Sequence, residues 1–182
     1  MFEQFIAKAE SVSAEVHRFP TKVGALDFIC AFLQDEGVAD MPHHYALWAK
    51  CPFLDGVERR DLDRIVGLKF DVTRELAATA HIGISQMDWA LADTGTLVQD
   101  ATAIDKRLVS TLPTIHIALV ATGSLRPDMP ACLTGIDPKG IGYLSMITGP
   151  SRTADIERVL TIGVHGPERL IIIFFDEFGG TN

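Results

Sequence analysis

The sequence of 182 residues predicts an α/β fold, on three observations. Two amphipathic patterns with helical spacing occupy residues 2–16 and 22–36. The β-branched, almost wholly apolar run at 115–120 is typical of a strand that is buried on both faces. Strand, helix and strand patterns follow one another over 143–175, which predicts a βαβ unit with a right-handed crossover and a parallel pair of strands.

The N-terminal part is predicted to be a helical segment, about 1–37, packed on the rest of the chain. In its first helix, apolar side chains recur at steps of three and four residues: Phe2, Phe5, Ile6, Ala9, Val12 and Val16. Its second helix follows Pro20-Thr21, ends near Gly37 and has its own apolar residues: Val23, Leu26, Phe28, Ile29, Phe32 and Leu33. Prolines and glycines divide 38–70 into short pieces, with one short helix indicated around Leu62, Ile65 and Val66.

The middle of the chain predicts a hairpin, a helix and a strand. Short apolar pieces at 81–86 and 89–92 precede Asp93-Thr94-Gly95, which has turn chemistry, and Thr96-Leu97-Val98 continues beyond it. Residues 103–112 are predicted to form a helix that Pro113 ends, directly before the buried strand.

The last third supplies the predicted βαβ unit. Residues 143–147 are the first strand, 148–152 a tight loop, and 153–163 a helix with three inward-facing side chains, Ile156, Val159 and Leu160. Gly166-Pro167 is typical of the end of a helix, and 170–175 form the second buried strand.

Length and charge limit the classes of function. One domain is expected over 1–182, because domains have roughly 100–200 residues. Sixteen Lys and Arg residues against 24 Asp and Glu give a net charge of −8. That charge argues against binding to nucleic acid or to an anionic membrane surface, both of which favour an excess of basic residues. A small anionic ligand is compatible with it, because a few N–H groups can hold one.

The termini and cysteines indicate a cytoplasmic protein with no cofactor of its own. The N-terminus lacks the basic and apolar regions of a signal peptide, and no run approaches the ~18 apolar residues that span a bilayer. The three cysteines, Cys30, Cys51 and Cys132, lie far apart without a CxxC pair. This usage fits a reducing compartment and offers no iron–sulfur or zinc cage.

The segment Thr148–Asp155 is the first candidate for a binding site. A loop that leaves the carboxyl end of a parallel strand and opens a helix presents free N–H groups and the positive end of the helix dipole. Gly149 permits close approach of a ligand, Ser151 or Thr153 caps the helix, and Arg152 adds a charged clamp for a carboxylate or phosphate. The alternative is plain capping, in which Arg152 pairs with an acidic residue of the first turn.

Other chemistries are weaker candidates. The segment 149–153 resembles the G-x-S-x-G nucleophile elbow, but Thr153 replaces the closing glycine. The glycines of 135–142 lack the G-K-[ST] of a P-loop. Among the histidines, His116 is expected in the core and His165 at a helix end, so no metal site is predicted. The turn at Asp93, Thr94, Gly95 and Thr96 is either a hairpin tip alone or part of a cleft.

Three stretches form recognisable motifs: Ala90-Leu91-Ala92-Asp93-Thr94-Gly95-Thr96-Leu97-Val98, Leu112-Pro113-Thr114-Ile115-His116-Ile117, and Thr148-Gly149-Pro150-Ser151-Arg152-Thr153-Ala154-Asp155-Ile156-Glu157 with Gly163-Val164-His165-Gly166-Pro167 after it. The first resembles the A-[DE]-T-G-T-[LIV] signature of the LUD domain, the second the L-P-P-x-H-I strand entry that follows there, and the third the most specific block of the family. Asp93 stands where Glu is common, and Thr114 replaces the second proline. The resemblance is to the lactate utilization protein C group (LutC/YkgG).

This resemblance implies a Rossmann-like three-layer α/β/α fold, similar to the NagB/RpiA/CoA-transferase superfamily, in a single LUD domain. It also implies a part in the oxidation of L-lactate to pyruvate, with iron–sulfur lactate utilization proteins as the partners that carry the clusters. It assigns no catalytic residue. The leading hypothesis is therefore a subunit without a redox centre that uses 148–155 and 93–96, together with His165, as a ligand or partner surface. The alternative is a stand-alone enzyme or sensor for a small phosphorylated, CoA-linked or carboxylate ligand.

Overall fold

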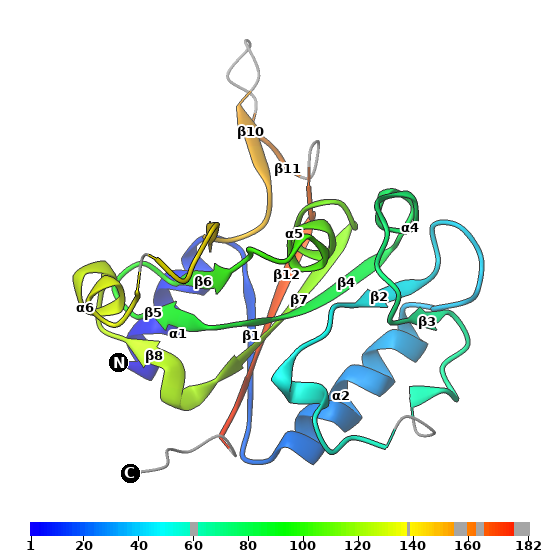
Figure 1. The fold of residues 1–182 in the computed structure, drawn as a ribbon, viewed down its shortest axis with the longest axis horizontal. Coiled ribbons are helices and arrows are strands. Elements are labelled where there is room, and N and C mark those ends of the chain that lie inside the picture. Colours follow the sequence, from blue (N-terminus) through cyan, green and yellow to red (C-terminus); the bar gives the residue numbers. More distant parts are fainter. Residues whose placement is uncertain (59–61, 138, 155–159, 163–165, 177–182) are drawn as a thin grey trace.

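A parallel sheet forms the centre of the molecule. The computed structural model describes residues 1–58, 62–137, 139–154, 160–162 and 166–176. Within these ranges, six strands lie side by side, each parallel to its neighbours (Figure 1). Their spatial order is β1 (Glu15–Phe19), β12 (Arg169–Phe175), β7 (Ile115–Ala121), β4 (Ile82–Met87), β2 (Ala46–Trp48) and β3 (Leu68–Lys69).

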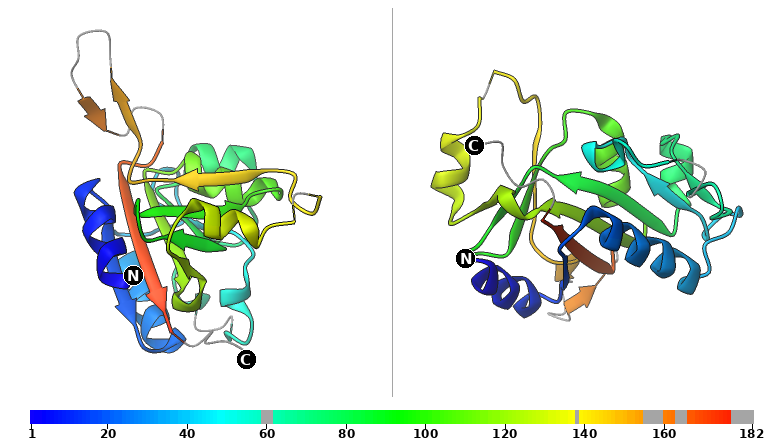
Figure 2. Two further views of the ribbon diagram at one scale, coloured as in Figure 1. Left: turned by 90° about the vertical axis from the view of Figure 1, so that its left-hand side faces the viewer. Right: turned by 90° about the horizontal axis from the view of Figure 1, so that it is seen from below.

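Two smaller sheets accompany it. Four short strands have the order β8 (Leu125–Arg126), β5 (Trp89–Leu91), β6 (Thr96–Asp100) and β9 (Leu144–Ile147). An antiparallel pair, β10 (Arg152–Ala154) and β11 (Leu160–Ile162), forms an arm that projects from the body of the molecule (Figures 1 and 2).

The helices cover both faces of the parallel sheet. The helix α2 (Lys22–Asp35), whose Thr21 hydroxyl accepts the N–H of Gly24 at 3.1 Å, packs on one face. The opposite face is covered by α1 (Phe2–Ser11), α4 (Arg74–Ala78), α5 (Ile104–Thr111) and the four-stranded sheet. The remaining helical elements are α6 (Met129–Thr134) and the short turns η1 (Pro52–Leu54) and η2 (Thr122–Ser124). No helix within the described ranges is both long and apolar enough to cross a membrane.

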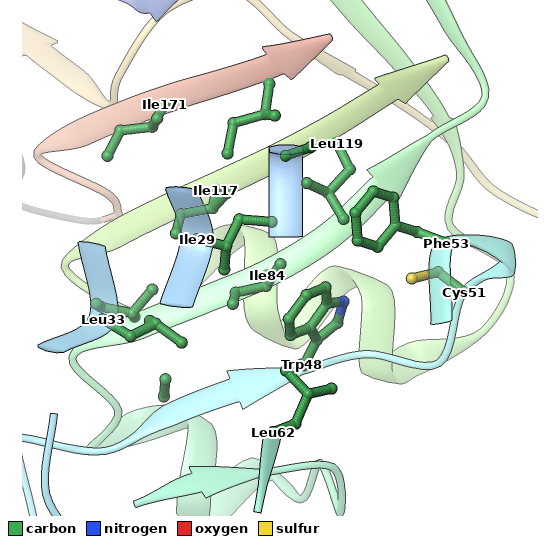
Figure 3. Close-up of a cluster of buried hydrophobic side chains, with 14 of the residues drawn as sticks. Ile29, Leu33, Trp48, Cys51, Phe53, Leu62, Ile84, Ile117, Leu119 and Ile171 are labelled. Atoms are coloured by element: carbon green, nitrogen blue, oxygen red, sulfur yellow. The ribbon is translucent and has the colours of Figure 1, made fainter. Parts of the chain in front are cut away.

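Alternation along the central strands places side chains in two cores. Ile117 and Leu119 of β7 face α2 and pack with Trp48 (Figure 3). Ala118 and Val120 face the other way and pack with α1 and the four-stranded sheet. Every residue of β7 is buried, which confirms the prediction of a strand covered on both faces.

Several predicted elements are confirmed with small changes in their ends. The second helix, the hairpin around residues 93–95, the helix at 103–112 and the strands at 115–120 and 170–175 correspond to α2, β5–β6, α5, β7 and β12. Of the short helix predicted around Leu62, the structure describes Leu62 as helical, whereas Ile65 and Val66 lie in a bend and a turn.

The first predicted helix is wrong in its second half. The helix α1 ends at Ser11, Ser13 has a positive φ of 69°, and residues 15–19 form β1, which pairs with β12. Val16 and Phe19 have high β propensity, and pairing along the edge of a parallel sheet outweighs a helical spacing of apolar residues.

The predicted βαβ unit at 143–175 is also wrong. The strand β9 is antiparallel to β6 in the four-stranded sheet, and the parallel partners of β12 are β1 and β7. The predicted helix at 153–163 is a strand at both of its described ends, in β10 and β11, while residues 155–159 lie outside the described residues. Because Thr153, Thr161 and Ile162 are β-branched, the ends of this segment favour strands.

Candidate functional site

Two of the predicted segments, the β5–β6 turn and the residues before β10, meet at the C-terminal end of α1. The hydroxyls of Thr96 and Thr148 join them with a hydrogen bond of 2.8 Å. Each segment has a glycine with positive φ, +69° at Gly95 and +71° at Gly149. A Cβ atom on Gly95 would lie 2.5 Å from a backbone nitrogen of α1, and one on Gly149 would lie 2.5 Å from the carbonyl oxygen of Val12. Only glycine permits this approach.

Arg152 is bound to the protein itself. Its Nη2 donates to the carbonyl oxygen of Val12 and, at 3.3 Å, to the hydroxyl of Ser13, just beyond the last residue of α1. Carbonyl groups at a helix C-terminus attract cations in this way. The prediction that Arg152 clamps an anion at a helix N-terminus is wrong in its structural premise, because strand β10 begins at Arg152.

A cavity of about 260 Å³ lies beside this junction, and we call it the histidine pocket. It is bounded by the ends of α5 and β9, the first residues of β7 and β12, and two loop segments: Ser110, Thr111, His116, Met146, Ile147, Thr148, Gly149, Pro150, Ser151, Gly166, Pro167 and Leu170. It therefore lies at the edge where β7 and β12 begin, whereas we expected the loop to leave the carboxyl end of a parallel strand. Its size suits a small ligand.

The described lining of the pocket is mostly apolar, carries a few hydroxyl groups and has no Lys, Arg, Asp or Glu side chain. The hydroxyl groups are those of Ser110, Thr111, Thr148 and Ser151. The loop segments are held together by the N–H of Ser151, which donates to the carbonyl oxygen of Pro167 at 2.8 Å. A ligand would meet neutral hydrogen-bonding groups here.

His116 lies in the wall of the pocket and is fully buried. Its Nε2 is 3.0 Å from the hydroxyl of Ser85 on the neighbouring strand β4. Burial away from water lowers the pKa of His116 from 6.5 to about 3, so the imidazole is neutral at physiological pH. The expectation of a hydrogen-bonded core histidine is confirmed, yet its Nδ1 is buried without a hydrogen-bond partner among the described residues.

The hydrogen bonds of this pair assign the tautomer. If Nε2 donated to Ser85, both the Ser85 hydroxyl hydrogen and Nδ1 would need further partners, which the described residues do not supply. If Ser85 donates to Nε2, only the Nδ1–H of this pair is without a hydrogen-bond partner among the described residues. A buried donor without an acceptor costs about 1–3 kcal/mol.

The other predicted site residues lie apart from the pocket. Asp93 donates its N–H to the carbonyl oxygen of Pro127 at 3.1 Å, and its Oδ1 is buried with no partner in the described part of the chain. Thr94 is exposed at the hairpin tip. Thr153 pairs with Thr161 in the arm, and the predictions for Asp155 and His165 fall outside the described residues.

Sequence reasoning did not identify Ser85, Ser110 and Thr111 as neighbours of the site. A signal for Ser85 and His116 was present, since each is a polar residue within an apolar strand, and the two strands are adjacent. For metals, the described ranges contain no group of three or more His, Cys, Asp or Glu residues that could hold an ion.

Curated proteins with similar sequences match about half of this chain. Lactate utilization protein C of Exiguobacterium sp. is 41% identical over 106 residues, which cover 55% of this chain and 46% of that protein. The protein of the same name from Bacillus subtilis is 37% identical over 110 residues, or 56% of this chain and 45% of that one. The chain thus spans about half the length of the curated relatives that it matches.

A solved structure extends the likeness to nearly the whole chain. A DUF162 family protein from Deinococcus radiodurans superposes with a TM-score of 0.67, covers 96% of this chain and 95% of its own, and is 19% identical. At that identity the likeness concerns the fold. The model of the LUD domain matches residues 2–175, and the chain therefore belongs to the LUD-domain family.

Proposed function

We propose that this chain takes part in lactate utilization, in the oxidation of L-lactate to pyruvate, as a cytoplasmic subunit without a redox centre of its own. The names of its relatives support the process. The cysteines support the division of labour: Cys30 lies in α2, Cys51 precedes η1 and Cys132 lies in α6. Three separate thiols cannot supply the four thiolates of a usual cluster, so iron–sulfur partner proteins would carry the redox centres.

The histidine pocket supports a ligand for this subunit. L-Lactate and pyruvate both have a carboxylate and a second oxygen on a small carbon skeleton. The buried Nδ1–H of His116 and the hydroxyl of Ser151 offer donors to such oxygens in a cavity of about 260 Å³. The hydroxyls of Ser110 and Thr111 already donate to the carbonyl oxygen of Arg107, at 3.2 and 2.6 Å, so towards a ligand they can only accept. We therefore propose that the histidine pocket binds a small carboxylate.

The lining also distinguishes among the alternative ligands. Phosphate groups and the pyrophosphate of CoA are usually held by Arg, Lys or a helix N-terminus. The lining that the structure describes contains no such cation, and Arg152 is engaged with α1. A carboxylate carries one negative charge and a phosphate about two, so an uncharged lining costs a phosphorylated or CoA-linked ligand more than a small carboxylate.

Growth on two carbon sources tests the process. Deletion of the gene should slow growth on L-lactate and leave growth on pyruvate intact, because the block lies between the two. Restoring the gene should restore growth. Equal impairment on L-lactate and pyruvate would refute a role in lactate oxidation.

A matched pair of variants tests the pocket. His116→Gln keeps an amide near the position of Nε2 and loses the Nδ1–H, whereas His44→Gln changes an exposed histidine. By calorimetry, L-lactate or pyruvate should bind the His116→Gln protein about tenfold more weakly, and the His44→Gln protein as the wild type does. Equal binding by all three proteins would remove His116 from the site.

A further inference from the structure

A second cavity, of about 360 Å³, lies at the opposite edge of the parallel sheet, and we call it the tryptophan pocket. It lies where β2 and β3 end, because Trp48 is the last residue of β2 and Phe70 directly follows β3. The full lining is Trp48, Lys50, Cys51, Leu54, Asp55, Val57, Leu62 and Phe70. In open α/β sheets, ligands bind at the carboxyl ends of the strands, which is the edge that this pocket occupies.

The walls of the tryptophan pocket are held in place by aromatic packing. The indole of Trp48 is fully buried and stacks with Phe53, at 5.9 Å between ring centroids and 26° between planes, and with Phe70, at 6.3 Å and 23°. The turn η1 is fixed to β4, because the N–H of Phe53 donates to Oε1 of Gln86 at 2.7 Å. The pocket is therefore preformed, and a ligand would lose little free energy in ordering it.

The indole N–H of Trp48 is buried and has no oxygen or nitrogen acceptor among the described residues, and its one neighbouring acceptor there is the thiol sulfur of Cys51. Figure 3 shows the nitrogen turned away from Ile84 and toward the side where Cys51 and Phe53 lie. Trp48 and Cys51 both line the pocket. The neighbouring thiol is a poor substitute for an oxygen acceptor, because burial raises the pKa of Cys51 and keeps it as neutral, weakly accepting sulfur.

The charged residues at the rim of the tryptophan pocket favour neither anionic nor cationic ligands. Lys50 and Asp55, of opposite sign, are both exposed, while the interior is formed by aromatic and aliphatic side chains. A flat, uncharged ring fits such walls, and an oxygen acceptor on that ring would satisfy the indole N–H.

We propose that the tryptophan pocket is a second ligand site, which binds a small, flat, uncharged aromatic molecule that carries a carbonyl oxygen. The carbonyl accepts the indole N–H of Trp48, and the ring packs against Trp48, Phe70 and Leu62. This site is independent of the histidine pocket, which lies at the other edge of the sheet and opens toward its other face.

Titration with benzamide, followed by the indole N–H signals in ¹⁵N–¹H spectra, tests this proposal. The chain has two tryptophans, Trp48 and Trp89, and a Trp89→Phe variant assigns their signals. Benzamide should shift the Trp48 signal in a saturable manner and leave the Trp89 signal in place. Acetamide, which has the carbonyl without the ring, and toluene, which has the ring without the carbonyl, should bind at least about tenfold more weakly.

Two variants separate the hydrogen bond from the cavity. Trp48→Phe keeps an aromatic wall and removes the donor, so benzamide should bind about tenfold more weakly and lose its advantage over toluene. Leu54→Trp fills the pocket from a half-buried position and should abolish the shift of the Trp48 signal. If the Trp48→Phe protein does not fold, the comparison of benzamide with toluene on the wild type decides. An unmoved Trp48 signal at saturating benzamide, or equal binding of toluene, would overturn the proposal.

Discussion

At both Gly83 and Gly149 an added side chain would clash with a backbone carbonyl oxygen, although the two glycines lie in different regions of the molecule. A Cβ atom on Gly83 would lie 1.9 Å from the carbonyl oxygen of Val109 in α5, and one on Gly149 would lie 2.5 Å from that of Val12 after α1. Gly83 lies within the central strand β4, between buried neighbours, while Gly149 lies in a loop at the junction with α1. In the sheet neither partner can move without disturbing the core, whereas in the junction Val12 and Gly149 both lie in turns or loops, which adjust more easily.

The two regions differ in the source of their constraint. The parallel sheet is fixed by apolar surface buried on both sides, as the wholly buried β7 shows. The junction is fixed by chain geometry: two glycines with positive φ, the Thr96–Thr148 hydrogen bond, and the contacts of Arg152 with the end of α1. Substitutions in the sheet should therefore cost more stability than substitutions in the junction.

The largest difference is expected between the two glycines. Gly83→Ala should lower the free energy of unfolding by about 3 kcal/mol or more, because overpacking a rigid core strains both backbones. Gly149→Ala should cost about 1–3 kcal/mol, from its positive φ and a contact that can relax. Denaturant titration of both variants measures this, and an equal loss would show that the junction is as rigid as the sheet.

A pH titration of stability examines the sheet at the histidine pocket. The pKa of His116 is about 3 in the folded protein and 6.5 as its ordinary value, so between these values the unfolded chain binds one more proton. Above pH 6.5 the neutral imidazole of His116 makes its whole contribution to the free energy of unfolding. Below pH 6.5 this contribution decreases by about 1.4 kcal/mol per pH unit. Between pH 6.5 and 5, the wild type should therefore lose about 2 kcal/mol from this group.

The matched histidine variants isolate that contribution. The His116→Gln protein should lack this part of the pH dependence, while the His44→Gln protein, changed at an exposed position, should keep it. Denaturant titrations at pH 5 and 6.5 measure how much the free energy of unfolding of each protein changes with pH. An equal change for the wild type and both variants would mean that His116 takes up a proton in the folded state as easily as in the unfolded chain.

The smallest effect is expected at Arg152 in the junction. Its side chain is exposed, and its hydrogen bonds are to the end of a helix, so Arg152→Ala should cost about 0–1 kcal/mol. Binding in the histidine pocket should be unchanged, because Arg152 does not line it. Thermal unfolding together with calorimetry checks both statements. A loss of carboxylate binding without a loss of stability would return Arg152 to the binding site.

The candidate site was predictable only in part. The residue types of Thr148, Gly149 and Ser151 predict a ligand-binding loop at the start of a helix; the helix is absent from the described residues there, but these three residues do line the histidine pocket. The sequence also predicts Arg152 as a charged clamp at this site, but its guanidinium donates to the carbonyl oxygen of Val12 after α1. The pocket itself depends on the juxtaposition of His116 with the 148–151 loop, and no local pattern encodes a distance between segments so far apart in the chain.

Elements with a dominant local pattern could be predicted from the sequence alone. The helix α2, the helix α5, the β5–β6 hairpin and the strands β7 and β12 follow from apolar spacing, capping and turn residues that act over a few positions. The tertiary structure decided the partners of β9, the strand character of β1 and the arm in place of a predicted helix. The physical reason is that a strand gains its hydrogen bonds from residues distant in sequence, so its stability depends on which neighbour is available once the cores have packed.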